Sequence, residues 1–164
     1  MTITLGSRAL RPARTPNRDL HDLLRRVVAD RELWLPLIKF GATERYWARI
    51  PVLEGVDVWL LTWTTSQGTE LHDHGESEAA FTVISGVLDE IRPDADRLVV
   101  HKRRPGSVVS VLPGELHDVR NDSAEPAVSI HEYSPRLTRM TYYSFDAGEA
   151  RPVRQVLSDE PEEA

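Results

Sequence analysis

The chain has 164 residues, no cysteine, 20 Lys or Arg and 26 Asp or Glu, which give a net charge of −6 with neutral histidines. This length fits a single domain with a substantial core, and the acidic balance argues against a broad nucleic-acid-binding surface. The lack of cysteine excludes disulfides, thiolate metal ligands and a cysteine nucleophile. No apolar run could span a bilayer and no signal-peptide core is present, so we expect a cytoplasmic protein without membrane, nucleic-acid or obligate protein partners.

The N-terminal part of the chain is expected to be helical after a short arm. Residues 1–16 contain two prolines and no sustained apolar period, which predicts a flexible arm. Apolar residues three and four positions apart then predict an amphipathic helix. They are Leu20, Leu23, Leu24, Val27 and Val28. A second, shorter helical segment is expected over residues 32–40, where Pro36 interrupts the pattern.

From residue 46 onward, short segments rich in Val, Ile, Thr and aromatic residues alternate with turn residues, a pattern typical of β-strands. The segments are 56–64, 79–91, 96–103, 106–114, 117–122, 127–134 and 140–145. Their spacing predicts an all-β sandwich or barrel carrying the small helical layer. We expect one domain over residues 17–150, followed by an acidic tail over residues 151–164.

Two histidines stand one residue apart in the stretch "ELHDHGESEAAFTVISG". In a β-strand, His72 and His74 would share one face while Asp73 points to the other. Two imidazoles on one face can chelate a metal, and a third ligand would have to come from another strand. His117 is the candidate, because it follows the Pro113–Gly114 turn and begins another strand-like segment.

These segments resemble the two cupin motifs. "HDH" followed by four residues and, later, Gly86 is similar to the first motif; Gly114, His117 and Asn121 keep the spacing of the second, with Pro113 one place late. The resemblance implies a mainly β, jelly-roll-like cupin barrel. Six residues separate the usual cupin glutamate from the glycine, which places that position at Ala79.

The substitution of the cupin glutamate changes the expected metal site. Glu78 is one residue away and would face the opposite side of a regular strand. The predicted site therefore has three neutral histidines and no carboxylate, unlike the two-histidine, one-carboxylate triad of many non-haem iron oxygenases. Neutral ligands leave the full charge on a divalent ion, which favours an anionic substrate donor such as a thiolate.

A second group of polar residues lies in "AVSIHEYSP". Ser129, His131 and Tyr133 alternate and would share one face of a strand. In such a relay the hydroxyl behind the histidine fixes the ring, and the histidine orients the phenol toward a bound ligand.

Together, "YWARIPV", "HDHGES", "LHDVRND" and "EPAVSIHEYSP" resemble the cysteine dioxygenase family over Arg45 to Pro135. The resemblance implies an Fe(2+) cofactor and roles for seven residues. The iron ligands would be His72, His74 and His117, the active-site tyrosine Tyr133, and its supporting pair Ser129 and His131. The arginine that binds the substrate carboxylate would be Arg49, with Arg45 as the alternative.

Two further features follow from the same resemblance. Animal members of the family link a cysteine to the active-site tyrosine, but the matching residue here is Ala79, and without cysteine the cross-link cannot form. Bacterial members usually lack it as well. The family also suggests a cis peptide bond between Ser134 and Pro135.

The expected function is an iron(II)-dependent thiol dioxygenase that converts L-cysteine and O₂ to cysteine sulfinate, an oxidoreductase of cysteine catabolism. Its partners would be a small thiol and dioxygen. One alternative is a dioxygenase of another thiol acid such as 3-mercaptopropionate, although family members with that preference typically do not keep an arginine at Arg49. The other is a non-oxidative metal-binding cupin, either an isomerase or a small-molecule-binding module, which would normally retain the glutamate that Ala79 replaces. The preferred thiol, the metal and the oligomeric state stay open.

Overall fold

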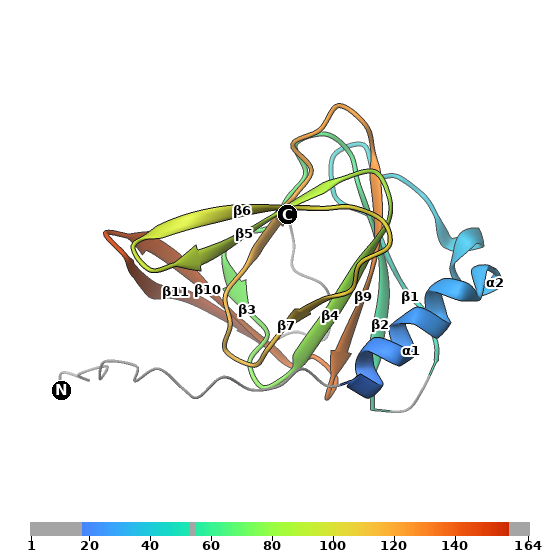
Figure 1. Cartoon of the computed structure of the whole chain (residues 1–164), viewed down its shortest axis with the longest axis horizontal. Coiled ribbons are helices and arrows are strands. Elements are labelled where there is room, and N and C mark those ends of the chain that lie inside the picture. The colour runs from blue at the N-terminus through green and yellow to red at the C-terminus, as the bar shows by residue number, and fades with distance from the viewer. Residues whose placement is uncertain (1–17, 53–54, 158–164) are drawn as a thin grey trace.

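The computed structural model describes residues 18–52 and 55–157 and contains, over these residues, two α-helices, one 3₁₀ helix and eleven strands (Figure 1). The helices are α1 (Arg18–Ala29), α2 (Arg31–Trp34) and the 3₁₀ helix η1 (Leu35–Leu37). The strands are β1 (Trp47–Arg49), β2 (Asp57–Trp63), β3 (His72–Asp73), β4 (Glu78–Ser85), β5 (Leu88–Asp94), β6 (Arg97–Arg103), β7 (Val109–Val111), β8 (Asp118–Arg120), β9 (Ala127–Ser134), β10 (Arg139–Asp146) and β11 (Glu149–Leu157). The expectation of a mainly β fold with N-terminal helices is confirmed.

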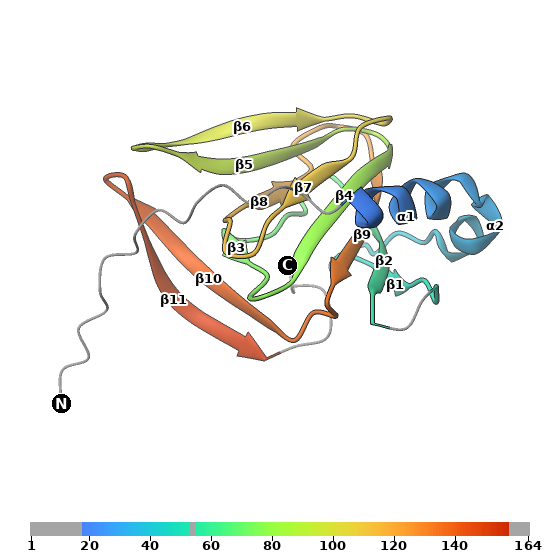
Figure 2. The same cartoon turned by 60° about the horizontal axis from the view of Figure 1, so that its bottom comes forward.

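The strands form two facing layers. One is a five-stranded sheet in the order β1-β2-β9-β4-β7, and the other combines the sheets β11-β10-β3 and β6-β5-β8. Isolated antiparallel bridges, His72 with His117 and Gly68 with Arg120, join these two smaller sheets. The β5–β6 and β10–β11 hairpins extend from the same side of the barrel (Figure 2). The junction between β3 and the segment leading into β8 therefore lies in the middle of its layer, and it carries two of the candidate ligands.

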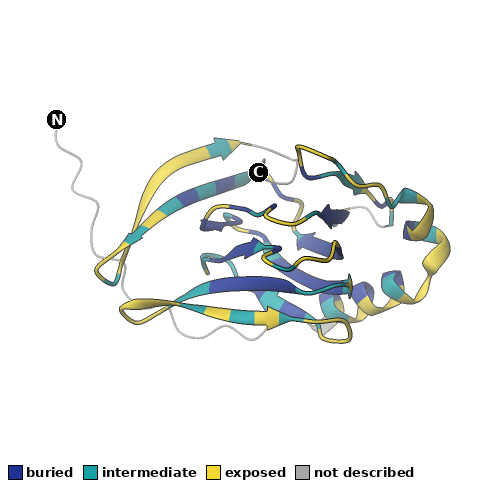
Figure 3. Cartoon of the chain, turned by 90° about the horizontal axis from the view of Figure 1, so that it is seen from above, coloured by how far each residue is buried: buried dark blue, intermediate teal, exposed yellow. Residues whose placement is uncertain are grey.

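Alternation along the five-stranded sheet separates two apolar cores. On β2, Trp59, Leu61 and Trp63 point into the barrel, whereas Val58 and Leu60 point outward. The outward face packs against the apolar stripe of α1, as the helical spacing predicted. Because both faces are covered, the central strands are buried throughout (Figure 3).

Gly86 explains the glycine of the first cupin-like motif. It has φ +77°, and a Cβ atom there would lie 2.6 Å from the Pro126 carbonyl oxygen. A side chain would therefore clash with the backbone just before β9, so the tight β4–β5 connection requires glycine.

Some element boundaries differ from the sequence-based expectation. Strand β1 was not expected, because three residues are too few to show an alternating pattern, and β3 ends at Asp73, one residue before the end of the strand assumed for His72 and His74. The helical segment over residues 32–40 is shorter than expected and turns into a 3₁₀ helix at Pro36, which cannot donate an α-helical hydrogen bond.

The boundary of the acidic tail is corrected. Residues 151–157, which the sequence analysis assigned to the tail, belong to β11 and pair with β10. Pairing with β10 stabilises this exposed edge strand, although its composition shows little alternation. The expected arm over residues 1–16 and the rest of the tail lie outside the described residues. Within the described residues, no helix has both the length and the apolar character needed to cross a membrane.

Candidate metal centre

Three histidines meet where β3 and the start of β8 lie side by side. The backbones of His72 and His117 exchange two hydrogen bonds, with N–O distances of 2.9 and 3.0 Å, so their side chains emerge as a cross-strand pair. His74 follows two residues after His72, as the His-x-His spacing predicted. All three side chains are buried. The structure thus brings together residues 43 and 45 positions apart on the chain, counting from His74 and His72 to His117.

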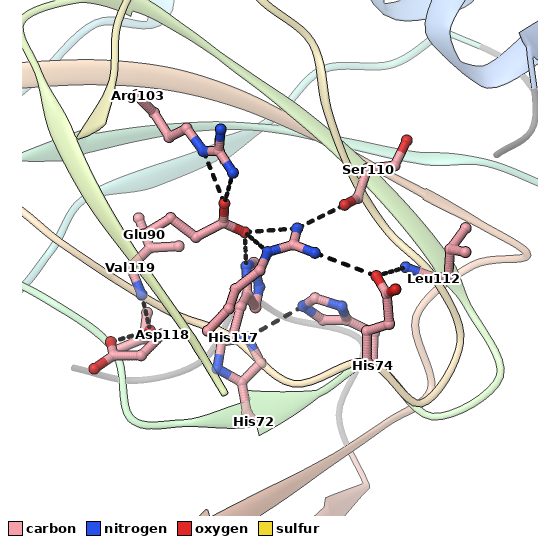
Figure 4. Close-up of polar contacts among 12 residues, drawn as sticks. His72, His74, Glu90, Arg103, Ser110, Leu112, His117, Asp118 and Val119 are labelled. Atoms are coloured by element: carbon pink, nitrogen blue, oxygen red, sulfur yellow. Dashed lines mark hydrogen bonds and ion pairs between the residues drawn. The ribbon is translucent and has the colours of Figure 1, made fainter. Parts of the chain in front are cut away.

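The imidazole rings converge (Figure 4). Their centroids are 4.8 to 5.0 Å apart, and the Nε2 atoms of His72 and His74 are separated by 3.1 Å. One nitrogen from each ring lies within 4.8 Å of those of the other two. A metal–nitrogen bond of about 2.1 Å places neighbouring ligand atoms about 3.0 to 3.4 Å apart, so the spacing of His72 and His74 suits one ion.

The contacts of the rings determine which nitrogen atoms are available to a metal. The Nδ1 of His72 lies 2.6 Å from the Glu70 carbonyl oxygen, and that of His117 lies 2.9 Å from the Glu90 Oε1. Both partners can only accept, so each Nδ1 donates, and the neutral ring keeps its lone pair on Nε2. The Nδ1 of His74 is buried and has no hydrogen-bond partner among the described residues.

Burial favours the uncharged form of two of these histidines, His74 and His117. It lowers the pKa of His74 well below its usual value, and the nearby His72 and His117 lower it further. Burial also lowers the pKa of His117, against the opposing effect of its hydrogen bond to Glu90. Neutral imidazoles with lone pairs directed at one point are the form that binds a divalent transition metal, so the residues present fit such an ion.

The sequence analysis missed Glu90, which lies behind His117. Glu90 is fully buried on β5 and directly opposite Val119, two residues after His117. Burial alone would raise its pKa, but the hydrogen bond from His117 and the neighbouring Arg92 lower it to about 2. The sequence did offer one signal. Glu90 lies two residues after Leu88 in the same expected strand, so the two side chains share the inward face.

The serine, histidine and tyrosine of β9 share the inner face of the barrel. Ser129 Oγ lies 2.8 Å from His131 Nε2 and accepts a hydrogen bond of 2.9 Å from the Trp63 indole. Phe81 stacks on the His131 ring at 4.9 Å with an interplanar angle of 8°. The His131 ring is therefore held by the Ser129 hydroxyl and by stacking on Phe81, and the hydroxyl is held by Trp63.

Tyr133 reaches the histidine cluster directly. Its ring centroid lies 5.0 Å from that of His74 and 5.0 Å from that of Trp59. Ala79 is its cross-strand partner on β4, which places the alanine beside the tyrosine, whereas Glu78 is in register with Ser134. The Ser134–Pro135 peptide bond is cis, as expected.

The two candidate arginines occupy different environments. Arg49 is exposed on β1, and its guanidinium carbon lies 5.9 Å from the centroid of Trp59, the ring that also contacts Tyr133. Arg45 is buried, with its guanidinium carbon 4.5 Å over Trp63. Arg49 thus lies beside Trp59 and Tyr133, next to the histidines, whereas Arg45 packs against Trp63, whose indole is hydrogen-bonded to Ser129.

The model of the family Cysteine dioxygenase type I matches residues 17–146 of the chain. The chain belongs to this family. It is similar to cysteine dioxygenase type 1 of Danio rerio, with 28% identity over 135 residues that cover 73% of this chain and 67% of that protein. The protein is therefore an oxidoreductase, a thiol dioxygenase of the cysteine dioxygenase family, and the family implies a metal centre.

Solved structures show the same fold. An uncharacterized Klebsiella pneumoniae protein with a double-stranded β-helix domain has a TM-score of 0.53 and 18% identity over 75% of this chain and 91% of its own. A cupin-superfamily sugar phosphate isomerase from Silicibacter pomeroyi has a TM-score of 0.54 and 18% identity over 67% of this chain and 76% of its own. The cupin barrel expected for this member of the cysteine dioxygenase family is confirmed.

Proposed function

We propose that this protein is an iron(II)-dependent cysteine dioxygenase that converts L-cysteine and O₂ to cysteine sulfinate. The observation that carries this proposal is the convergence of three buried histidines beside Tyr133 in a chain of the cysteine dioxygenase family. In the overall reaction both atoms of dioxygen are transferred to sulfur. The thiolate is oxidised by four electrons, which reduce dioxygen, and no further reductant is needed.

His72, His74 and His117 would hold the metal. Iron(II) supplies the one-electron chemistry that allows dioxygen to react and a positive charge that binds the substrate sulfur, whereas zinc has no redox chemistry. Because the three ligands are neutral, the divalent charge is not reduced by the protein. A free thiol has a pKa of about 8.5, and such a charge favours its thiolate form at neutral pH.

Tyr133 would place a phenolic hydroxyl beside the reacting sulfur or dioxygen. Its ring lies against His74, and β9 also carries Ser129 and His131 on the same inner face. The hydrogen bond between Ser129 and His131, together with the one that Trp63 donates to Ser129, limits movement of these side chains. A hydroxyl held in place can donate a hydrogen bond without first losing side-chain freedom, which favours the reaction.

Arg49 would bind the substrate carboxylate. A guanidinium group offers two parallel N–H donors that match a carboxylate, and Arg49 is exposed while contacting the same tryptophan as Tyr133. Arg45 lies buried against Trp63 and is less accessible to a ligand. An arginine that binds the carboxylate, together with a metal ion that would bind the sulfur and the nitrogen, would select an α-amino acid thiol.

The proposal is tested with iron-loaded protein and a panel of L-cysteine, cysteamine and 3-mercaptopropionate. We expect oxygen uptake with L-cysteine above all, one O₂ consumed per sulfinate, and two heavy oxygen atoms in the product formed from ¹⁸O₂. Oxidation of 3-mercaptopropionate alone would overturn the cysteine assignment but leave the thiol dioxygenase. No oxygen uptake with any thiol by protein with a full complement of iron would overturn the proposal.

A further inference from the structure

Glu90 is the buried side chain behind His117, and it has no role in the proposed reaction as described above. Its carboxylate is completely inaccessible to solvent and lies on the opposite side of the His117 ring from the other two histidines (Figure 4). We propose that Glu90 is a positioning residue of the metal centre, which holds His117 in one tautomer and one ring orientation so that Nε2 faces the metal. This inference rests on the proposed metal-binding function.

The carboxylate is itself held in place by two arginines. Oε1 accepts hydrogen bonds from His117 Nδ1 and Arg92 Nε, both 2.9 Å long, and Oε2 accepts from Arg103 Nε at 2.8 Å and from its terminal nitrogen at 2.6 Å. Arg92 also donates to the Ser110 carbonyl oxygen at 2.6 Å. Rotation of the carboxyl group would break several of these bonds at once, so the acceptor facing His117 has a defined position.

The charges around Glu90 indicate that it orients His117 and does not supply a negative charge to the metal centre. Two carboxylates, Glu90 and Glu115, pair with two guanidinium groups, Arg92 and Arg103, so the charge of Glu90 is already balanced by its arginine partners. It therefore does not replace the negative charge of the cupin glutamate missing at Ala79. What Glu90 gives His117 is a fixed hydrogen-bond acceptor, which a neutral imidazole can satisfy only through Nδ1–H.

The three histidines differ in how their outer nitrogen is held. Nδ1 of His72 donates to a backbone carbonyl oxygen, and Nδ1 of His74 has no partner among the described residues. His117 is the member of the described cluster whose Nδ1 is bound by a side chain. A substitution of Glu90 therefore changes the support of one candidate ligand and leaves the other two unaltered.

The test compares Glu90→Gln with Asp89→Asn in the full-length protein. Asp89 neighbours Glu90 on β5 and forms a 2.7 Å ion pair with Lys102, so the control makes the same carboxylate-to-amide change without contacting a histidine. Every group that faces the Glu90 carboxylate is a donor, and an amide offers one acceptor oxygen and one NH₂ group. Glu90→Gln must therefore leave a donor facing a donor at His117 or at an arginine.

Two measurements are made, and neither needs turnover. Nitrogen-15 NMR of metal-free parent protein should show neutral His117 protonated on Nδ1, and Glu90→Gln should show a mixture of tautomers. Chelator competition with Co²⁺ should give an affinity about 10- to 100-fold weaker for Glu90→Gln, with an altered visible absorption spectrum, and parent-like values for Asp89→Asn.

The outcomes separate this inference from the metal-binding proposal. Equal Co²⁺ affinities and spectra for the parent and Glu90→Gln would overturn the positioning role while the metal site stands. If Glu90→Gln does not fold, the parent spectrum decides: His117 protonated on Nε2 in metal-free protein would overturn the role. A parent that binds no divalent metal but shows Nδ1–H at His117 would contradict the metal site and not the hydrogen-bond geometry.

Discussion

Glu132 should make the free energy of unfolding of this protein fall as the pH rises, and Glu132→Gln should abolish this contribution. The residue lies between His131 and Tyr133 on β9, so its side chain points away from the histidines and toward the core beneath α1, on the side of Ile130. It is fully buried, and neither carboxylate oxygen has a hydrogen-bond partner among the described residues. Burial raises its pKa from 4.5 to about 8, against a smaller opposing effect of Arg26.

The shift gives the sign and size of the effect. Because the folded protein binds this proton more tightly than the unfolded chain, the stabilising contribution is complete below pH 4.5 and is lost as the pH rises from 4.5 through 8. One pKa unit corresponds to about 1.36 kcal/mol, so the loss reaches about 3 kcal/mol at pH 7. This is a large part of the roughly 5–15 kcal/mol by which domains are stable.

The assay is urea unfolding of metal-free parent and Glu132→Gln protein at several values between pH 5 and pH 8. Glutamine has nearly the same shape and does not ionise, so the free energy of unfolding of the variant should exceed that of the parent increasingly as the pH rises. The difference should grow by about 2.5 kcal/mol from pH 5 to pH 7. Glu125→Gln, at an exposed position, is the matched control and should follow the parent. Parallel curves for the parent and Glu132→Gln would refute the reasoning, because the Glu132 carboxyl would then titrate normally in the fold.

Three further predictions concern the metal centre and the substrate. His117→Ala should remove most of the bound metal while circular dichroism still shows a β-rich fold, whereas His101→Ala should keep it; full metal content in His117→Ala would exclude that ligand. Tyr133→Phe should retain metal content and melting temperature but lower turnover about 10-fold or more, because only the hydroxyl is lost; unchanged turnover would leave the tyrosine a packing role. Arg49→Ala should reduce kcat/KM for L-cysteine about 10- to 100-fold and for cysteamine, which has no carboxylate, much less; equal losses would contradict carboxylate binding, and a loss confined to Arg45→Ala would transfer the role to that arginine.

Features that depend on local periodicity could be predicted from the amino-acid sequence. The spacing of Leu20, Leu24 and Val27 identified α1, since residues three and four apart share one face of a helix. The two-residue period placed Ser129 and His131 on one face of β9 in the same way. The motif spacing also singled out the three histidines that the fold brings together.

Contacts between strands far apart in the chain were decided by the tertiary structure. The position of Glu90 behind His117 depends on the pairing of β5 with β8, and no local pattern specifies which strands become neighbours. The burial of Glu132 depends on α1 covering the outer face of β9; an isolated strand would leave that carboxylate in water. The separation of exposed Arg49 from buried Arg45 likewise follows from the packing of Trp59 and Trp63. Periodicity indicates which face of an element a side chain occupies, but only the packed fold determines what lies against that face. The reason is that these contacts join residues about 20 to 80 positions apart in the chain, as between His117 and Glu90 or between Leu137 and Asp57.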